Sequence, residues 1–464
     1  MLTTTTQAVK EAPSRGEWSS RLGFVLAAAG SAVGLGNIWK FPYITGVNGG
    51  GLFVLVYLGC VTFVGIPILA AEVLIGRAAR SSSVGSFRRL AGGRSPWLAF
   101  GVLGVITPTI ILSYYSVVAG WCLDYVWTAM SGGLGGDVAA IPGIFDALHA
   151  NADRNLFWHF SFMALTAGIV VGGVRGGVER ASRFLMPALF VMLVALLVNS
   201  MFLPGFGDGL RFVLSPQPER LTGAGVLEAL GHAFFTLSVG MGAMLTYGSY
   251  LSPRESLPTA AASVGVLDTL VGLGACLVIF PITFSFGLEP SAGPGLVFKS
   301  LPLAFAQMPL GSFWAFAFFV LLFFAALTSA ISLLEVSTSF AIDEWGISRR
   351  TAALAAAALI FVIGIPSALS GGKGLFGAGL ADATGRSWFD WFDHAASNWL
   401  LPIGGLGIAA FVAWRLEDEL RHSAFAAGTR QARTARIYRG WLFLIRYVAP
   451  AGIVAVFLHG VGVI

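Results

Sequence analysis

The sequence predicts an all-α membrane protein, and its hydrophobicity, the length of its apolar segments and its loop charges support that prediction. Hydrophobic residues make up 56% of the 464 positions, charged residues only 11%, and the mean hydropathy is +0.80. A soluble domain carries roughly 25% charged residues. Eleven apolar segments approach the roughly 20 residues that a helix needs to cross hydrocarbon. These predicted spans centre on residues 19–46, 50–76, 96–130, 156–174, 181–202, 225–251, 257–287, 310–342, 350–369, 390–415 and 441–462.

Loop charges predict how these helices are oriented. The first eighteen residues are polar and lack a signal-peptide pattern, so we expect a cytoplasmic amino terminus. With that orientation, 21 of the 28 Lys and Arg residues fall on the cytoplasmic side, as the positive-inside rule requires. An odd number of spans then places the carboxyl terminus outside. The net charge of +5 reflects this bias and gives no indication of a nucleic-acid partner. Cys60, Cys122 and Cys276 lie within apolar segments, so we expect no disulfide framework.

The connecting segments divide the chain into two helical halves. Residues 77–95 are basic and are expected to be cytoplasmic, whereas residues 288–309 alternate turn-forming and apolar residues and predict an external re-entrant hairpin. No separate soluble domain is expected. The predicted organisation is a cytoplasmic segment (1–18), helices 1–5 (19–202), an external loop rich in Pro and Gly (203–224), helices 6–10 (225–415), a cytoplasmic loop (416–440) and helix 11 (441–464).

Two of the apolar segments are interrupted by glycine clusters at corresponding places in the two halves. The first reads AGSAVGLGN (Ala29–Asn37) and the second TLSVGMGAM (Thr236–Met244), and both contain Val-Gly-x-Gly. A glycine costs a helix about 1 kcal/mol relative to alanine. Irregular backbone at membrane depth persists only where it lines a cavity or is buried in protein. Paired broken helices therefore predict a secondary transporter with its substrate and ion site near the membrane midplane.

Four motifs, in order along the chain, resemble the neurotransmitter:sodium symporter family. They are RGEWSSRLGFVLAAAGSAVGLGNIWKFPY (Arg15–Tyr43), GIPILAAEVLIGR (Gly65–Arg77), FFTLSVGMGAMLTYGSY (Phe234–Tyr250) and FFAALTSAISLLE (Phe323–Glu335). The resemblance extends over nearly the whole chain, without the family's usual twelfth span. It implies two inverted five-helix repeats, with helices 1 and 6 broken, followed by helix 11. It also implies sodium-coupled uptake of amino acids by alternating access.

The first break suits sodium because unwound backbone frees carbonyl oxygens, and the half-helix that follows points its positive end at an anion. The resemblance implies two sodium sites. Sodium 1 would use Ala32, Asn37, Thr236 and Asp268, and sodium 2 would use Gly30, Val33, Ala325, Thr328 and Ser329. Two alternatives stay open: Gly30 and Gly34 could form a small-residue packing face, and the hydroxyls of Thr328 and Ser329 could simply bond carbonyls one turn back.

Asp268 lies in the apolar run SVGVLDTLVGLGAC, where an aspartate costs about 2.5–3.5 kcal/mol. The bacterial leucine transporter, a family member, resembles this segment with an asparagine there and a glutamate one turn later; here the later residue is Gly272. Chloride-dependent members place a serine at that later position. We infer that Asp268 supplies the negative charge that chloride provides in those members, which predicts chloride-independent transport. A structural carboxylate bonded to nearby hydroxyls is the alternative.

Gly34 predicts the substrate class, because amine-transporting relatives carry an aspartate there that pairs with the ligand ammonium. With glycine, the ligand should bring its own carboxylate, and Tyr115 matches the family tyrosine whose hydroxyl binds it. The uncharged pocket favours neutral hydrophobic side chains, and the adaptable Met241 predicts that aromatic ones are included. The predicted substrate site comprises Ala32, Gly34, Gly36, Ile111, Tyr115, Phe235, Thr236, Ser238, Met241, Gly242, Ser329 and Leu333.

Two charge pairs resemble the gates of this family. Lys40 and Asp393 would close the outer path, where relatives use an arginine; lysine keeps the charge but loses the bidentate fork. On the inner side, Arg15 would pair with Asp343 at the end of the eighth span. The alternatives are a Lys40 that reaches toward lipid headgroups and an Arg15 that is one cytoplasmic charge among many.

Three further features complete the prediction. Trp18 and Tyr250 would pack beside the inner gate, and Glu72 would bond near the first break. Gly177 and Pro187 flank the start of the fifth span with nine residues between them, as in family members, so this end could unwind and admit water to sodium 2. A simple helix kink is the competing interpretation.

Two other classes of function are alternatives. Ser238 could suggest an intramembrane serine protease, but the nearby spans offer no histidine in a suitable polar setting. A substrate-gated sensor or channel of the same fold is the second alternative. The expected partners are an amino acid, two sodium ions and the lipid bilayer, in a bacterial-type inner (cell) membrane. We expect the monomer to be the functional unit, with a dimer possible.

Overall fold

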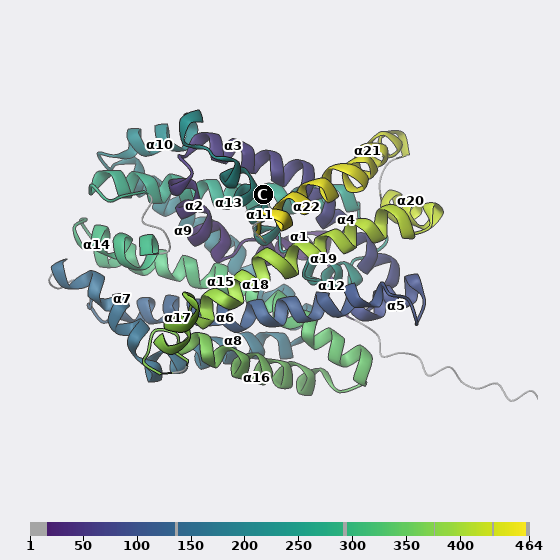
Figure 1. The fold of residues 1–464 in the computed structure, drawn as a ribbon, viewed down its shortest axis with the longest axis horizontal. Helices are drawn as coiled ribbons and strands as arrows, with labels where there is room; N and C mark the ends of the chain where they lie inside the picture. The colour runs from purple at the N-terminus through teal and green to yellow at the C-terminus, as the bar shows by residue number, and fades with distance from the viewer. Residues whose placement is uncertain (1–15, 135–137, 291–294, 375, 429–430, 461–464) are drawn as a thin grey trace, which may run out of the picture.

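The computed structural model describes residues 16–134, 138–290, 295–374, 376–428 and 431–460. Within these ranges the chain is helical without any strand, and most helices run roughly along one direction (Figure 1). The main apolar helices are α1 (Arg21–Ala32), α2 (Phe41–Val47), α3 (Gly51–Cys60), α4 (Ile66–Ala79), α6 (Leu98–Met130), α8 (Ala152–Val171), α9 (Arg180–Met201), α11 (Gly223–Thr236), α12 (Ala243–Ser249), α13 (Leu257–Ser285), α15 (Gly311–Trp345), α16 (Arg349–Ala368), α18 (Trp388–Ala395), α19 (Leu401–Ala410), α21 (Gln431–Phe443) and α22 (Ala449–Gly460).

Shorter elements join these helices. The connecting helices are α5 (Ser83–Ala91), α7 (Ile141–Ala150), α10 (Phe206–Leu214), α14 (Leu301–Ala306), α17 (Ala378–Thr384) and α20 (Asp418–Ala426). Wider π-type turns continue or precede several helices, at η1 (Gly36–Lys40), η2 (Val61–Gly65), η4 (Val174–Glu179), η6 (Leu296–Ser300), η7 (Ala396–Leu400), η8 (Phe411–Arg415) and η9 (Leu444–Val448). Two tight turns are η3 (Val138–Ala140) and η5 (Pro218–Arg220).

The connecting helices gather at opposite ends of the bundle. Figure 1 shows α7, α10, α14 and α17 at the left end and α5, α20 and α21 at the right end. The segments predicted to be external, 203–224 and 288–309, therefore lie opposite the segments predicted to be cytoplasmic, 77–95 and 416–440. The last apolar helix begins earlier than predicted, because α21 starts at Gln431 within the segment predicted to be a cytoplasmic loop.

The number of membrane spans stays a prediction. Among the described residues, eight helices are long and apolar enough to cross a membrane, and the bent pair of α1 with η1 and α2 would be a ninth. Helices also occur at the two remaining predicted places. The helix α8 is 20 residues long, but its first turns carry Asp153, Arg154 and His159. The helices α11 and α12 are each short, because residues 237–242 separate them.

The first break bends the chain by 49° between Arg21–Ala32 and Gly36–Val47. The helix α1 begins at Ser20, whose hydroxyl accepts the Gly23 N–H, and it ends where Val33 turns extended (ψ 101°). Only residues 33–35 separate α1 from η1. Asn37 stabilises this short break, since its side-chain oxygen accepts the Gly34 N–H at 3.0 Å.

The second break is longer and more strained. Gly240 and Gly242 have φ of 85° and 71°, which glycine adopts readily, whereas Ser238 has φ of 52°. A non-glycine residue in the left-handed region costs of order 1 kcal/mol. The Ser238 hydroxyl donates to the Ser31 carbonyl at 2.8 Å and thereby joins the two breaks.

Glu72 contacts the second break, and the expectation that it bonds near the first break is wrong. Its carboxylate accepts the backbone N–H groups of Gly240 and Leu245. Glu72 is fully buried in α4, which packs against α12 rather than α1. The glutamate therefore satisfies backbone donors that the missing helical turn leaves without partners.

Candidate substrate and sodium sites

The two breaks and the helices α6 and α15 enclose a small cavity of about 20 Å³. Its lining residues are Ser31, Ala32, Gly34, Gly36, Ile111, Tyr115, Phe235, Thr236, Ser238, Met241, Ser329 and Leu333. The sequence pattern missed Ser31, which precedes the predicted lining by one position. It also placed Gly242 at the site, but that residue faces α6, since a Cβ on it would lie 2.6 Å from the Gly104 carbonyl oxygen.

The lining of this cavity is polar around Gly34 and also includes apolar side chains. A Cβ on Gly34 would lie 2.5 Å from the Ser329 hydroxyl and 2.8 Å from the Tyr115 hydroxyl, which form the polar end. The Leu35 N–H donates to the Tyr115 hydroxyl at 3.1 Å. Ile111, Met241 and Leu333 supply apolar lining. No charged side chain is among these lining residues, and the cavity has room for about one water molecule.

Three of the four residues predicted for sodium 1, Asn37, Thr236 and Asp268, lie together, and Ala32 lines the cavity that Thr236 also lines. The Asn37 amide donates to Asp268 Oδ1 at 2.8 Å and the Thr236 hydroxyl donates to the same oxygen at 2.9 Å. The Tyr57 hydroxyl reaches Asp268 Oδ2 at 3.3 Å. All these donors are neutral, and no ion pair involves Asp268 in the part of the chain that the structure describes. Burying a carboxylate without a counter-charge costs free energy, which a bound cation would offset. A hard cation prefers oxygen ligands, and the carboxylate and hydroxyl oxygens gathered here fit that preference.

The residues predicted for sodium 2 lie where α1 meets α15. A Cβ on Gly30 would lie 3.1 Å from Thr328 Cβ, so the two helices touch there. The Ser329 hydroxyl lies 3.3 Å from the carbonyl oxygens of both Gly30 and Val33. The Thr328 hydroxyl also donates to the Ala325 carbonyl of its own helix at 3.0 Å, as expected if it simply bonds a carbonyl one turn back. These hydroxyl and carbonyl oxygens are ligands that suit a sodium ion. In this structure the hydroxyls donate hydrogen bonds to the carbonyls.

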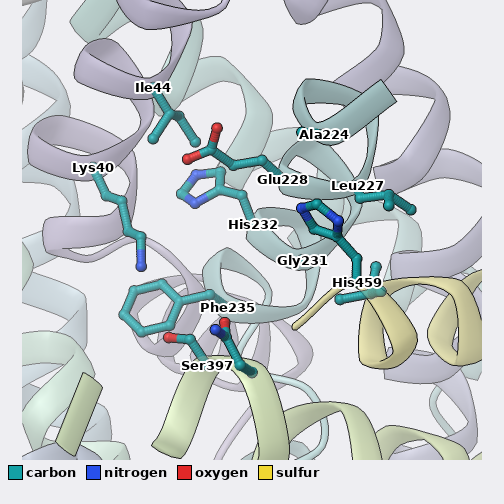
Figure 2. A pocket seen from close by; sticks show the side chains of 12 residues that line it. Lys40, Ile44, Ala224, Leu227, Glu228, Gly231, His232, Phe235, Ser397 and His459 are labelled. Carbon is teal, nitrogen blue, oxygen red and sulfur yellow. The ribbon is translucent and has the colours of Figure 1, made fainter. Parts of the chain in front are cut away.

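The side expected to be external carries the predicted charge pair and a second cavity. Lys40 Nζ lies 3.5 Å from Asp393 Oδ2, and the Tyr114 hydroxyl donates to Asp393 Oδ1 at 3.0 Å. Lys40 also lines a cavity of about 290 Å³, shown in Figure 2. Its polar lining includes Glu228 and His232, which the sequence pattern missed. His232 is 3% exposed and stacks on Phe41 with ring centroids 5.5 Å apart.

The inner side is held by aromatic and charged contacts. Arg15 lies outside the described residues, and Asp343 accepts the Ser82 N–H at 2.7 Å. Trp18 packs against Tyr250 with ring centroids 6.2 Å apart. The Tyr250 hydroxyl donates to Glu335 at 2.8 Å.

Glu335 received no role from the sequence, although a glutamate within an apolar helix was a visible signal. It is fully buried and forms an ion pair with Arg349 at the start of α16. The Arg349 guanidinium also donates to the Val170 carbonyl at the end of α8 at 2.9 Å. Gly177 lies in η4 and Pro187 lies inside α9, so the wide turn ends at Glu179 and regular helix begins at Arg180; unwinding of this end stays a prediction.

Two broken helices around a small cavity, within a bundle of apolar helices, are the arrangement of a multi-pass membrane transporter. The chain belongs to the sodium:neurotransmitter symporter family, whose family model matches residues 15–138 and 152–463. Its members couple transport to sodium.

Relatives and a solved structure agree with this assignment. The uncharacterized sodium-dependent transporter YhdH of Bacillus subtilis (strain 168) is 38% identical over 453 residues, covering 97% of this chain and 98% of that protein. The sodium- and chloride-dependent taurine transporter of Bos taurus is 25% identical, covering 85% of this chain and 73% of that protein. The crystal structure of MhsT in complex with L-phenylalanine is similar with a TM-score of 0.88 and 44% identity, covering 96% of this chain and 100% of that chain.

Proposed function

We propose that this protein uses the inward movement of sodium to take up neutral hydrophobic L-amino acids, aliphatic and aromatic, by alternating access. The carrying observation is the cavity between the breaks, which Gly34 and Tyr115 line together with the apolar side chains of Ile111, Met241 and Leu333 and without a charged side chain. Both sodium sites, the eleven spans, the inverted repeats and the cytoplasmic amino terminus are parts of this proposal. The complex of MhsT with L-phenylalanine supports an aromatic amino acid as one substrate.

The test is uptake of radiolabelled leucine, phenylalanine and tryptophan into proteoliposomes, with and without an inward sodium gradient. We expect sodium-dependent accumulation of each. Gly34→Asp should abolish it, because a carboxylate at the polar end of the cavity repels the substrate carboxylate and fills its space. Gly59→Ala is the control, since a Cβ on Gly59 meets nothing within 4 Å. Saturable binding without accumulation would favour a sensor, and uptake without saturation would favour a channel.

We further propose that transport does not require chloride. Asp268 already places a negative charge among the sodium 1 residues. Gly272, where chloride-dependent members carry a serine, contributes no side-chain oxygen, although a Cβ there would lie 3.7 Å from the Asn37 amide nitrogen. Replacing chloride with gluconate should leave uptake unchanged. A steep loss of uptake would contradict this proposal while leaving sodium coupling intact.

A further inference from the structure

A buried carboxylate outside both gate pairs holds the cytoplasmic end of α1. Glu179 is the last residue of η4 and is 2% exposed. Its carboxylate accepts the backbone N–H of Ser19 at 3.0 Å and the Ser19 hydroxyl at 2.5 Å. Ser19 directly precedes the N-cap of α1, so the negative charge also faces the positive end of the α1 dipole. The carboxylate thus joins α1 to the beginning of α9.

Neighbouring residues are shaped around this contact. A Cβ on Gly23 would lie 1.9 Å from the Glu179 carboxylate, so only glycine leaves room for it. Arg183, in the first turn of α9, donates to Glu179 at 2.7 Å, to the Ser19 hydroxyl at 2.6 Å and to the Ser20 hydroxyl at 3.0 Å. We call these five residues, Ser19, Ser20, Gly23, Glu179 and Arg183, the α1 clasp.

The clasp is attached to an irregular part of the chain. The turn η4 contains Gly176 and Gly177 and follows Gly173, which has φ of 85°. Gly177 is packed so tightly that a Cβ on it would lie 1.9 Å from the Ile169 carbonyl oxygen. A wide turn with glycines is easier to unwind than a regular helix. Movement in η4 would therefore displace the Glu179 carboxylate.

The same helix reaches the residues predicted for sodium 2. Met186 precedes Pro187 in α9, and its sulfur would lie 3.3 Å from a Cβ on Gly30. The stretch from Glu179 to Met186 therefore contacts α1 at its cytoplasmic end and again near its break. Release at the clasp would free α1 from α9 at the end through which the sodium path would open.

We propose that Glu179 is a positioning residue of the transport cycle, which makes the unwinding of η4 and the release of α1 one coupled event. The inference rests on the alternating-access transport proposed above. The cytoplasmic half of α1 cannot move away without breaking both Ser19 hydrogen bonds, and η4 cannot unwind without moving their acceptor. Hydrogen bonds to an ionised group are roughly twice as strong as neutral ones, so each element restrains the other.

The experiment measures how often the inner path opens. Ser339→Cys, in a Cys60→Ser background, is the reporter. Ser339 is 2% exposed, and together with Tyr250 it lines a further cavity at the end of the bundle expected to be cytoplasmic. A membrane-impermeant thiol reagent is applied to the cytoplasmic face in saturating sodium without amino acid. We expect Glu179→Gln to raise the labelling rate about tenfold and to weaken the sodium protection of the cysteine, since the charge-assisted bonds are lost. Ser19→Ala should act in the same direction with a smaller effect, since it removes one donor and keeps the carboxylate.

Glu344→Gln is the matched control. Glu344 forms a cytoplasmic ion pair with Arg88 at 2.7 Å, but this pair joins α15 to α5 and not α1 to α9. Its labelling rate should equal that of the parent. Equal labelling of the Glu179→Gln, Ser19→Ala and parent proteins would overturn the coupling. Failure of the parent to accumulate amino acid with sodium would instead overturn the transport proposal, which is measured separately by uptake.

Discussion

The two helix breaks differ in how they are fastened, although their sequences are similar. The first break is three residues long; the hydroxyls of Thr328 and Ser329 on α15 reach its Val33 carbonyl, and the Asn37 side-chain oxygen accepts its Gly34 N–H. The second break is six residues long, and it is held by the Glu72 carboxylate and by direct backbone contact with α19. The first is bonded by groups that can exchange for sodium, and the second by groups that cannot. We therefore expect the first break to rearrange during transport and the second to stay fixed.

The largest expected effect comes from removing the carboxylate that fastens the second break. Glu72→Ala leaves the N–H groups of Gly240 and Leu245 buried without acceptors, at about 1–3 kcal/mol each. We expect loss of uptake and a lower thermal midpoint in detergent. Glu72→Gln retains one acceptor oxygen and should recover part of the stability. If Glu72→Ala kept parental stability, the second break would not be fixed by this residue.

A smaller effect is expected where the second break touches α19. A Cβ on Gly404 would lie 2.0 Å from the Gly240 carbonyl oxygen. Gly404→Ala must separate the two backbones, and overpacking of this kind costs about 1–3 kcal/mol. Uptake should fall while the sodium concentration for half-maximal uptake changes little, and a large change in sodium affinity would contradict the assignment. Gly59→Ala, in an open position, should be neutral in the same assays.

The smallest effect on stability, with the most selective effect on sodium, is expected at the first break. Thr328→Val keeps the shape of the side chain but removes the hydroxyl predicted for sodium 2. Apparent sodium affinity should fall about tenfold, the effect of losing roughly 1.4 kcal/mol of binding, with an unfolding midpoint close to that of the parent. Thr338→Val is the control, because its hydroxyl bonds only the Leu334 carbonyl of its own helix. An equal sodium response in both variants would remove Thr328 from the ion site.

The sequence predicts the residues that local pattern determines and misses those that packing determines. Glycine clusters marked both breaks, and Gly34, Tyr115 and Ser329 do lie around one cavity. Their roles as ligands stay predictions. Glu72 was assigned to the wrong break, because a position in a helix does not tell which neighbour its side chain faces. Ser31 was missed because serine beside a break has no distinctive pattern. Gly242 was predicted for the substrate site but faces α6, a neighbour that is distant in sequence.

The charged residues show the same division. Lys40 and Asp393 could be paired from their family positions, and they lie 3.5 Å apart. Glu179 could not be connected to Ser19, because 160 residues separate them and the motifs in which they stand do not indicate that the two side chains meet. The partners of a buried charge depend on which helices are adjacent, and one sequence does not contain that information.

The backbone conformation of Ser238 matters for attempts to raise the thermal stability of this protein. Its left-handed backbone makes glycine the obvious stabilising replacement, with a gain of order 1 kcal/mol. The same replacement deletes the hydroxyl that binds the Ser31 carbonyl across the two breaks, at a similar cost. A screen for heat resistance would therefore register almost no change at this position. A library selected only for thermal stability would accept such a variant and lose the hydrogen bond by which the second break contacts the end of α1.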